Sequence, residues 1–194
     1  MKKILITGAA GFIGSNLINR LVKEEHMIAV INRASNNYNS SIIEYIGDIT
    51  DYDFVSKTIK DFNPTNVFHL AAYKKRSSNV EDIRTSLNIN LIGTLNLYES
   101  LLRLDSLRSV ISLGTTDEYG DCISPYNENL KEKPLSAYGF SKFCVSKLSE
   151  FFYKNFNLPV NVLRPTIAYG PFQGMEMFVP SLITTMIKGD FYKM

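Results

Sequence analysis

Short apolar runs alternate with longer segments of helical period from one end of this 194-residue sequence to the other. Parallel strands impose such an alternation, because each strand needs a crossover, usually a helix, before the next can run in the same direction. Right-handed crossovers place helices on both faces of the sheet. The sequence therefore predicts an α/β fold, a doubly wound parallel sheet, with ligands bound over the carboxyl ends of its strands.

The apolar periodicity predicts the positions of the strands and helices. Strands are expected at residues 3–7, 27–31, 42–46, 66–70, 108–113 and 160–163, where short apolar runs end at polar or glycine residues. Helices are expected at residues 12–23 and 51–62, from Val80 to Leu104, at Ala137–Phe156 and at Phe178–Ile187, with Thr50 or Asp51 capping the second. Because the sequence shows no repeat or linker, we expect one domain.

The charge of the chain is nearly balanced, since 21 Lys and Arg residues against 19 Asp and Glu residues leave a net charge of +2. These charges are spread along the sequence, so we predict neither a nucleic-acid partner nor a polybasic membrane surface. The densest basic run is Lys74, Lys75 and Arg76. It is interpreted as a solvated loop after a strand, and the alternative is that it contacts a phosphate.

The two cysteines, Cys122 and Cys144, have neither the spacing of metal ligands nor the number needed for a disulfide framework. A reducing, cytoplasmic setting fits this usage, and no metal site is expected. No apolar run is long enough to span a membrane. The apolar run after the N-terminal lysines is too short for a signal peptide and is interpreted as the first strand.

The stretch TGAAGFIG places Gly8, Gly11 and Gly14 between the first strand and the first helix. Gly8 permits a tight turn, Gly11 lets the backbone approach a pyrophosphate, and Gly14 lets the helix pack closely on the sheet. The N–H groups at the start of the helix then face the phosphates. A plain strand–helix turn needs one glycine rather than three, so the pattern predicts a dinucleotide cofactor.

The end of the second strand is expected to select the cofactor. An acidic residue there would bind the ribose hydroxyls of NAD, but this chain has Asn32 and Arg33. Arg33 can hold a 2′-phosphate by charge-assisted hydrogen bonds, which favours NADP over NAD, unless its side chain simply points into solvent. Asp48, followed by Ile49, comes after the third strand and is expected to receive the adenine amino group, to cap a helix, or both.

The stretch SAYGFSK carries Tyr138 and Lys142, four residues apart at the start of a predicted helix. This spacing puts both side chains on one helix face, one turn apart. A nearby ammonium favours the phenolate of a tyrosine, which can then move a proton on and off a carbinol oxygen. The pair alone is common in ordinary helices, and it gains meaning from the dinucleotide loop and from the Ser/Thr cluster after the fifth strand.

Taken together, these motifs resemble the extended short-chain dehydrogenase/reductases of the NAD-dependent epimerase/dehydratase family, which act on nucleotide sugars. The matching stretches cover residues 2–190 in the family's order: TGAAGFIGSNL, GDIT, VFHLAA, NINLIGTLNLYES, SLGTTDEYG, YGFSK and LRPTIAYGP. The resemblance implies a Rossmann fold. It also implies a homodimer formed through the helix from Val80 to Leu104 and the helix Ala137–Phe156.

The resemblance assigns roles to individual positions. It implies pyrophosphate contacts for Gly8, Gly11, Phe12, Ile13 and Gly14, adenosine contacts for Leu70, Ala71 and Ala72, and nicotinamide contacts from Pro165 to Ile167. Tyr138 would be the acid/base, while Lys142 would hold the nicotinamide ribose and lower the pKa of Tyr138. Asn90 would tie the long helix to the loop after the fourth strand, and His69 is interpreted as structural.

Two departures from the family pattern qualify these expectations. Many relatives carry a substrate-binding asparagine where this chain has Ile167, so the usual position of the sugar is not assured. Relatives also continue into a small substrate domain. We therefore expect residues 1–194 to form the NAD(P)-binding Rossmann domain, with residues from about 172 onward beginning a substrate-binding part that is largely absent.

The stretch SLGTTDEYG decides between reaction types. In the family's dehydratases a threonine four residues before the tyrosine is followed by an Asp-Glu pair. Counting back from Tyr119 without a gap reaches Thr115, which is followed by Thr116 and Asp117. This register makes Thr115 the hydroxyl that orients the substrate oxygen and does not reproduce the Asp-Glu pair. A register shifted by one residue restores the pair only with a deletion before Tyr119.

The sequence therefore predicts an NAD(P)-dependent enzyme that transfers hydride at a carbon of a nucleoside-diphosphate sugar. A 4-keto-sugar reductase or an epimerase is favoured over a 4,6-dehydratase, with Thr115, Tyr138 and Lys142 as the principal catalytic residues and Thr116 and Asp117 behind them. The alternative from another class is a dinucleotide-binding module without catalytic activity.

Overall fold

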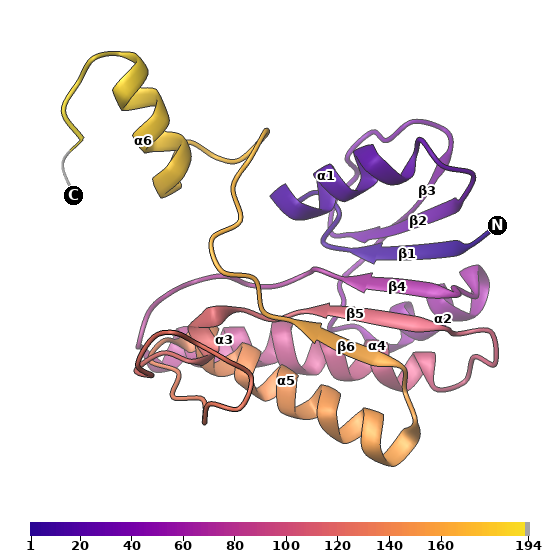
Figure 1. The fold of residues 1–194 in the computed structure, drawn as a ribbon. Coiled ribbons are helices and arrows are strands. Elements are labelled where there is room, and N and C mark those ends of the chain that lie inside the picture. Colours follow the sequence, from indigo (N-terminus) through magenta and orange to yellow (C-terminus); the bar gives the residue numbers. More distant parts are fainter. Residues whose placement is uncertain (193–194) are drawn as a thin grey trace.

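The computed structural model describes residues 1–192 and contains the predicted parallel sheet (Figure 1). Its strands are β1 (Lys3–Thr7), β2 (Met27–Asn32), β3 (Ile42–Ile46), β4 (Asn66–His69), β5 (Ser109–Leu113) and β6 (Val160–Leu163). They lie in the order β3-β2-β1-β4-β5-β6, and every neighbouring pair is parallel. The order reverses between β1 and β4, which is where a doubly wound sheet opens its ligand crevice.

Helices cover both faces of the sheet (Figure 1). They are α1 (Phe12–Leu21), α2 (Tyr52–Phe62), α3 (Val80–Ser86), α4 (Gly93–Leu101), α5 (Ala137–Phe156) and α6 (Phe178–Ile187). Alternate residues of β1 enter two separate cores, as the period of a strand requires: Leu5 packs with the helices α2, α4 and α5, whereas Ile4 and Ile6 pack with α1. The predicted α/β layering is therefore confirmed.

The long helix predicted from Val80 to Leu104 is interrupted. A π-helical segment (η1, Leu87–Ile92) separates α3 from α4, and α4 ends at Leu101. The buried Asn90 lies within this segment, accepts from the Tyr73 backbone N–H (2.7 Å) and donates to its carbonyl (3.0 Å). This confirms that Asn90 ties the helix to the loop after β4. The local widening is typical of π-segments, which concentrate at functional sites.

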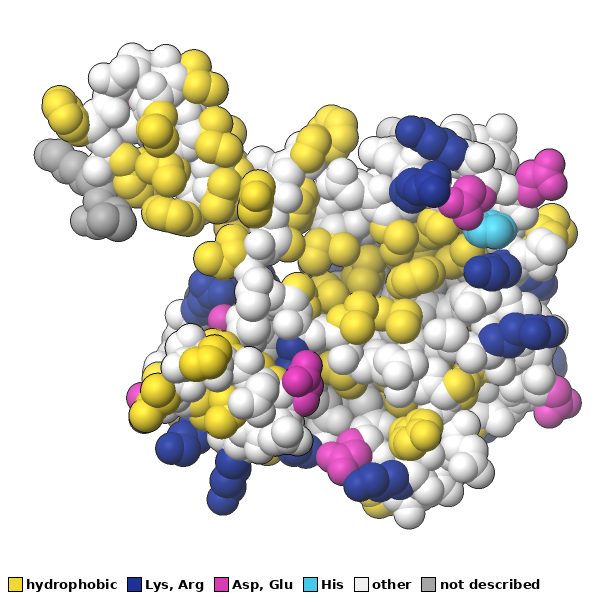
Figure 2. Space-filling view, in the orientation of Figure 1, with side chains coloured by type: hydrophobic (Ala, Val, Ile, Leu, Met, Phe, Trp, Pro, Cys, Tyr) yellow, Lys and Arg dark blue, Asp and Glu magenta, His cyan; other side chains and the backbone are white. Residues whose placement is uncertain are grey.

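The last helix, α6, stands apart from the sheet and its covering helices (Figure 1). None of its residues is buried, and hydrophobic side chains gather over its surface (Figure 2). Ile187 in this helix and Phe191 after it are 81% and 98% exposed. Within the described residues no helix combines the length and the apolar character needed to cross a membrane.

Candidate active site

The turn after β1 has the geometry expected of a glycine loop. Gly8 has a φ of +71°, and a Cβ there would lie 2.6 Å from the backbone nitrogen of Ala71. Only glycine combines that conformation with that approach. A Cβ at Gly14 would lie 2.5 Å from the Gly8 carbonyl oxygen. Gly11 is the N-cap of α1 and provides no side-chain cap, so the first N–H groups of the helix remain available to a ligand.

A cavity of about 600 Å³ opens beside this turn, over the carboxyl ends of β1, β2 and β4. Among the predicted cofactor residues, its lining includes Gly8, Gly11, Asn32, Arg33, Asp48, Ile49, Leu70, Ala71 and Ala72. Phe12, Gly14, Tyr138 and Lys142 do not line it. Ile13 and Pro165 line a different cavity beside β6, and Ile167 is 70% exposed. The structure therefore brings together the predicted contacts to the adenosine half of a dinucleotide, but not those to its nicotinamide half.

The lining also contains residues that sequence reasoning did not assign, such as Tyr73, Asn36 and Lys74. Of these, only Lys74 could have been suspected from the sequence, because it belongs to the basic run considered as a phosphate contact. That run divides in the structure: Lys75 pairs with Asp82 (3.0 Å) and Arg76 pairs with Asp117 (2.7 Å). Two cations of the run thus form ion pairs with different elements, Lys75 with α3 and Arg76 with the turn after β5. The third, Lys74, lines the cavity.

The loop after β2 is organised by Glu44, which the sequence did not single out. Its carboxylate accepts from the Asn32 amide (3.1 Å), the Ser35 hydroxyl (2.8 Å) and the Asn36 backbone N–H (3.1 Å). The Ser35 hydrogen bond is the main cause of a lowered Glu44 pKa. Asn32 is therefore engaged within the protein, whereas the exposed Arg33 lines the cavity.

Asp48 lies at the cavity and stabilises its own turn. It accepts from the backbone N–H and the hydroxyl of Thr50, both at 2.8 Å. The alternative that Asp48 caps a helix is wrong, because the N-cap of α2 is Asp51, which accepts from the Phe54 N–H at 3.1 Å. Capping by Asp51, one of the two residues expected there, is confirmed.

Tyr138 lies in the first turn of α5, after the N-cap Ser136. Burial raises the pKa of Tyr138 to about 12, and the charges of Asp117 and Glu118 add to the effect. The Arg76 guanidinium and the nearby Thr115 hydroxyl act in the opposite direction. Arg76 is therefore the cation that lowers the Tyr138 pKa in this arrangement, and the expected effect of Lys142 stays a prediction.

Lys142 follows one turn later and is only 2% exposed. Burial lowers its pKa to about 8, and the carboxylate of Glu118 partly opposes that shift. Burial disfavours the charged form of each side chain. It therefore raises the pKa of the acid Tyr138 and lowers the pKa of the base Lys142.

Thr115 precedes a short 3-10 turn after β5 (η2, Thr116–Glu118), and Asp117 lies within that turn. Thr115 is its N-cap and accepts from the Asp117 N–H, while its hydroxyl meets Tyr138. Asp117 is held by Arg76 through two bonds of 2.7 and 3.1 Å. Thr116 instead lines the cavity beside β6. Of the two threonines, Thr115 is therefore the one beside Tyr138.

His69 is held in one tautomer by its neighbours. Thr94 donates its hydroxyl proton to the Asn90 carbonyl, so it accepts from His69 Nε2 (2.8 Å). The Thr7 hydroxyl, which accepts from the Ala71 N–H, donates to His69 Nδ1 (2.7 Å). Burial, with a smaller contribution from Lys142, lowers the pKa of His69 to about 3. These contacts support the interpretation of His69 as a structural residue.

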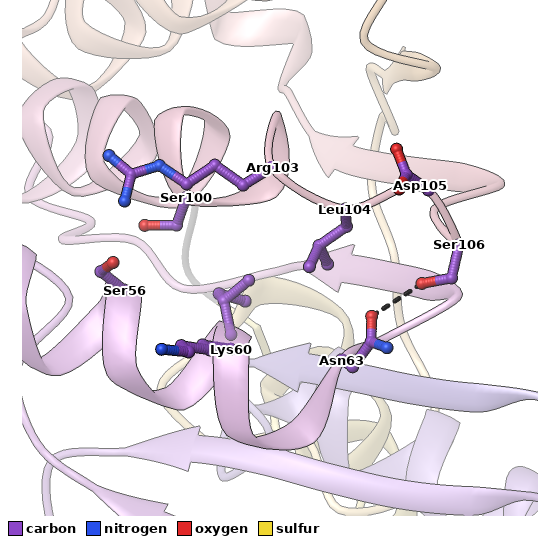
Figure 3. A pocket seen from close by; sticks show the side chains of 9 residues that line it. Ser56, Lys60, Asn63, Ser100, Arg103, Leu104, Asp105 and Ser106 are labelled. Carbon is purple, nitrogen blue, oxygen red and sulfur yellow. Dashed lines mark hydrogen bonds between the residues drawn. The ribbon is translucent and has the colours of Figure 1, made fainter.

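A further cavity, of about 530 Å³, lies near the C-terminal ends of α2 and α4 (Figure 3). Lys60 and Arg103 extend along it, and Asn63 and Ser106 join across one end at 2.7 Å (Figure 3). It contains none of the predicted site residues, so we assign the candidate active site to the carboxyl ends of the strands.

Comparisons with known proteins show the family to which the chain belongs. The profile of the NAD dependent epimerase/dehydratase family matches residues 4–193. A UDP-glucose 4-epimerase of Mycolicibacterium smegmatis is 30% identical, over 97% of this chain and 66% of its own length. A dTDP-glucose 4,6-dehydratase of Mycobacterium tuberculosis is 27% identical, over 96% of this chain and 60% of its own length.

Among solved structures, the fold is similar to that of a UDP-glucuronic acid 4-epimerase of Bacillus cereus in complex with UDP-glucuronic acid and NAD. The TM-score is 0.83 and the sequences are 31% identical, over 96% of this chain and 63% of that one. The chain thus spans less than two thirds of the length of these relatives. On the match over residues 4–193, the chain belongs to the NAD dependent epimerase/dehydratase family.

Proposed function

We propose that this chain carries the cofactor-binding and proton-transfer part of an NAD(P)-dependent enzyme that acts on a nucleoside-diphosphate sugar. One observation carries the proposal: the Thr115 hydroxyl lies close enough to Tyr138 to lower its pKa, and Lys142 follows on the same face of α5. A hydroxyl and a phenol paired in this way can hold one substrate oxygen between them. The nucleotide-sugar substrate is inferred from the relatives.

The residues around the cavity fit a dinucleotide, because Gly8 and Gly11 line it where the uncapped N-terminus of α1 begins, a position suited to a pyrophosphate. A bound nicotinamide cofactor supplies the acceptor or donor of the hydride. Tyr138 Oη would give a proton to, or take one from, the substrate oxygen, and the Thr115 hydroxyl would orient that oxygen. Lys142 would hold the ribose and favour the tyrosinate when oxidation is required.

The raised pKa of Tyr138 favours reduction of a 4-keto sugar, and the pairing of Asp117 with Arg76 places 4,6-dehydration behind both reduction and epimerisation. With a raised pKa, Tyr138 holds its proton at neutral pH and is ready to donate it to a carbonyl oxygen. Dehydration also needs a carboxyl group that protonates the departing hydroxyl. Asp117 is the candidate for that role, but both of its oxygens accept from Arg76. A 4,6-dehydratase is the second candidate.

The identity of the cofactor is proposed from Arg33. Its exposed side chain lines the cavity, and no carboxylate in residues 1–192 forms an ion pair with it. A free guanidinium is suited to the 2′-phosphate of NADP. We expect Arg33→Gln to weaken NADPH binding by about 10- to 100-fold, the range for one or two charge-assisted hydrogen bonds.

The measurement is calorimetric titration of the wild type and of Arg33→Gln, each with NADPH and with NADH. NADH affinity should be nearly unchanged, because NADH lacks the phosphate. Equal weakening of both cofactors would show that Arg33 supports the loop instead, and a wild-type preference for NADH would assign the site to NAD.

The proposed function is tested by Tyr138→Phe. The variant should bind NADPH as the wild type does and lose turnover of a nucleotide-sugar substrate by about 100-fold or more, because the proton transfer is lost. UDP-glucose and UDP-glucuronic acid with NADP⁺ or NAD⁺ are the first probes for oxidation and epimerisation at C4, and a nucleoside-diphosphate 4-keto sugar with NADPH is the probe for reduction. If the wild type binds a cofactor and turns over no probe, the result favours a dinucleotide-binding module without catalytic activity. If Tyr138→Phe retains full turnover, the acid/base assignment is wrong.

We also propose that two copies pair through the helices α3, η1, α4 and α5, in a reducing cytoplasmic setting. The support for pairing is apolar exposure along α5, where Phe140 and Phe151 are 41% and 54% exposed. Both cysteines are free thiols, which suits the setting.

A further inference from the structure

The carboxylate of Glu118 is completely buried directly behind Thr115. Its Oε1 accepts from the Thr115 backbone N–H at 2.9 Å. Its Oε2 accepts from the Ser146 hydroxyl of α5 at 2.6 Å and from Arg164 Nε at 2.8 Å. One side chain therefore joins the end of β5, the middle of α5 and the residue that follows β6.

The contact with Ser146 is important because of where it lies on α5. Tyr138, Lys142 and Ser146 are spaced four residues apart, so they share one face of the helix. The bond from Ser146 to Glu118 fixes this face, and the bond from Glu118 to Thr115 fixes the neighbouring strand end. One carboxylate therefore connects Thr115 to the helix face that carries Tyr138.

Two glycines show how closely these parts are packed. A Cβ at Gly114 would lie 2.7 Å from Glu118 Oε1 and 3.0 Å from Arg164 Cγ. A Cβ at Gly139, next to Tyr138, would lie 2.6 Å from the Asp117 carbonyl oxygen. The backbone on both sides of the site is therefore closely packed, at Gly114 against the Glu118 carboxylate itself and at Gly139 against the Asp117 backbone.

Arg164 compensates the buried charge. Besides Glu118, its guanidinium donates to the Tyr119 hydroxyl (3.1 Å) and to Glu132 (2.7 Å), and it lies over the Tyr119 ring, 5.0 Å from the centroid. A buried carboxylate is tolerated only when it is paired and hydrogen-bonded, and both conditions are met here.

We propose that Glu118, paired with Arg164, is the positioning residue that holds the Thr115 hydroxyl against Tyr138 for proton transfer to the substrate. Glu118 exchanges no proton with the substrate itself, since both of its oxygens accept hydrogen bonds from the protein. The inference rests on the proposed function, because it assigns to Glu118 the alignment of the two groups to which that function gives the chemistry.

The first test is turnover by the Glu118→Gln variant. Misplacement of a reacting group by about 1 Å costs roughly 100-fold in rate, so kcat should fall by about that factor while KM and the NADPH affinity change little. Glu132→Gln is the matched control: it removes the other carboxylate on the same Arg164 guanidinium but touches neither Thr115 nor Ser146. Glu132→Gln should keep a kcat near that of the wild type.

The second test needs no substrate. In chain labelled with ¹³C at the tyrosine ring, the resonance of Tyr138 is identified by its loss in Tyr138→Phe. Glu118→Gln and the uncharged Ser146→Ala should both move this resonance, and Glu132→Gln should leave it in place. Ser146→Ala separates position from charge and carries the test if Glu118→Gln does not fold, as judged by circular dichroism.

The outcomes separate this inference from the proposed function. Loss of turnover in Tyr138→Phe with wild-type turnover in folded Glu118→Gln would overturn the positioning role alone. Equal effects of Glu132→Gln and Glu118→Gln on the tyrosine resonance would also overturn it. If no variant or probe shows turnover, the proposed function fails, and the resonance in Ser146→Ala still decides whether Glu118 sets the position of Tyr138.

Discussion

Burial controls the protonation of three side chains that lie close to one another at the carboxyl edge of the sheet. It raises the pKa of Tyr138 to about 12 and lowers those of Lys142 and His69 to about 8 and about 3. Each shift favours the neutral form, as expected where water is excluded. The site at rest therefore holds the tyrosine proton, and a second charged group must approach before the proton is released.

The two neighbouring threonines give a direct comparison of roles. Thr115→Ala removes the hydroxyl that meets Tyr138, so we expect kcat to fall by about 100-fold or more. Thr116→Ala, which changes a side chain on the cavity beside β6, should leave kcat near the wild-type value. Steady-state kinetics on both variants checks this. The reverse order of effects would show that the shifted register is the correct one.

The buried His69 predicts how stability depends on pH. Its pKa of about 3 in the folded chain lies below the ordinary value of 6.5, so the unfolded chain binds the extra proton between these values. Stability attributable to His69 is therefore intact above pH 6.5 and is lost as the pH falls toward 3, at up to about 1.4 kcal/mol per pH unit.

Urea unfolding between pH 4 and pH 8 measures this slope. His69→Gln, which lacks the titrating ring, should lower the free energy of unfolding at pH 7 and show a smaller loss on acidification. An unchanged slope in the variant would assign the acid sensitivity to the carboxylates.

At the scale of elements, the strands and most helices follow from apolar periodicity because nearly all of them bury one regular face. The π-helical segment does not, since it depends on Asn90 reaching the loop after β4, a contact that no local pattern encodes. The ion pairs of Arg76 and Glu118 could not be predicted from the sequence for a similar reason. A basic run and an acidic residue normally face solvent, and only the tertiary fold brings Arg76 to Asp117 and Arg164 to Glu118.

The cap of α2 gives a prediction at this scale. Asp51→Ala removes the side-chain acceptor of the Phe54 N–H and should lower the free energy of unfolding by about 1 kcal/mol. Asp51→Asn retains an acceptor of the same size and should restore most of the loss. Urea denaturation of the three proteins gives the values; equal destabilisation by Ala and Asn would point to charge rather than to capping.

At the scale of the whole molecule, the unpartnered side chains on α5 have a regular arrangement. Phe140 and Phe151 are separated by 11 residues, close to three helical turns, so they lie on one face of the helix. Exposed aromatic side chains in such a row are typical of a surface that binds another protein. The parallel sheet buries the opposite side of the helix.

The proposed pairing of two copies is testable through this row. Light scattering with size-exclusion chromatography should give twice the mass of one chain, and Phe151→Glu should shift the mass to that of one chain because a charge would be buried. Tyr153→Glu changes another exposed aromatic side chain of α5, about 200° around the helix from Phe151, and is the control. A wild-type mass of one chain at the highest usable concentration contradicts the pairing.

The isolation of α6 has a consequence for the dynamics of the chain. A helix of ten residues with no buried side chain lacks the packing that holds short helices together in water. Its amide hydrogens should exchange with solvent by local opening, at a cost far below that of unfolding the sheet. The protein would then have two regions of very different protection, with the boundary between β6 and Phe178.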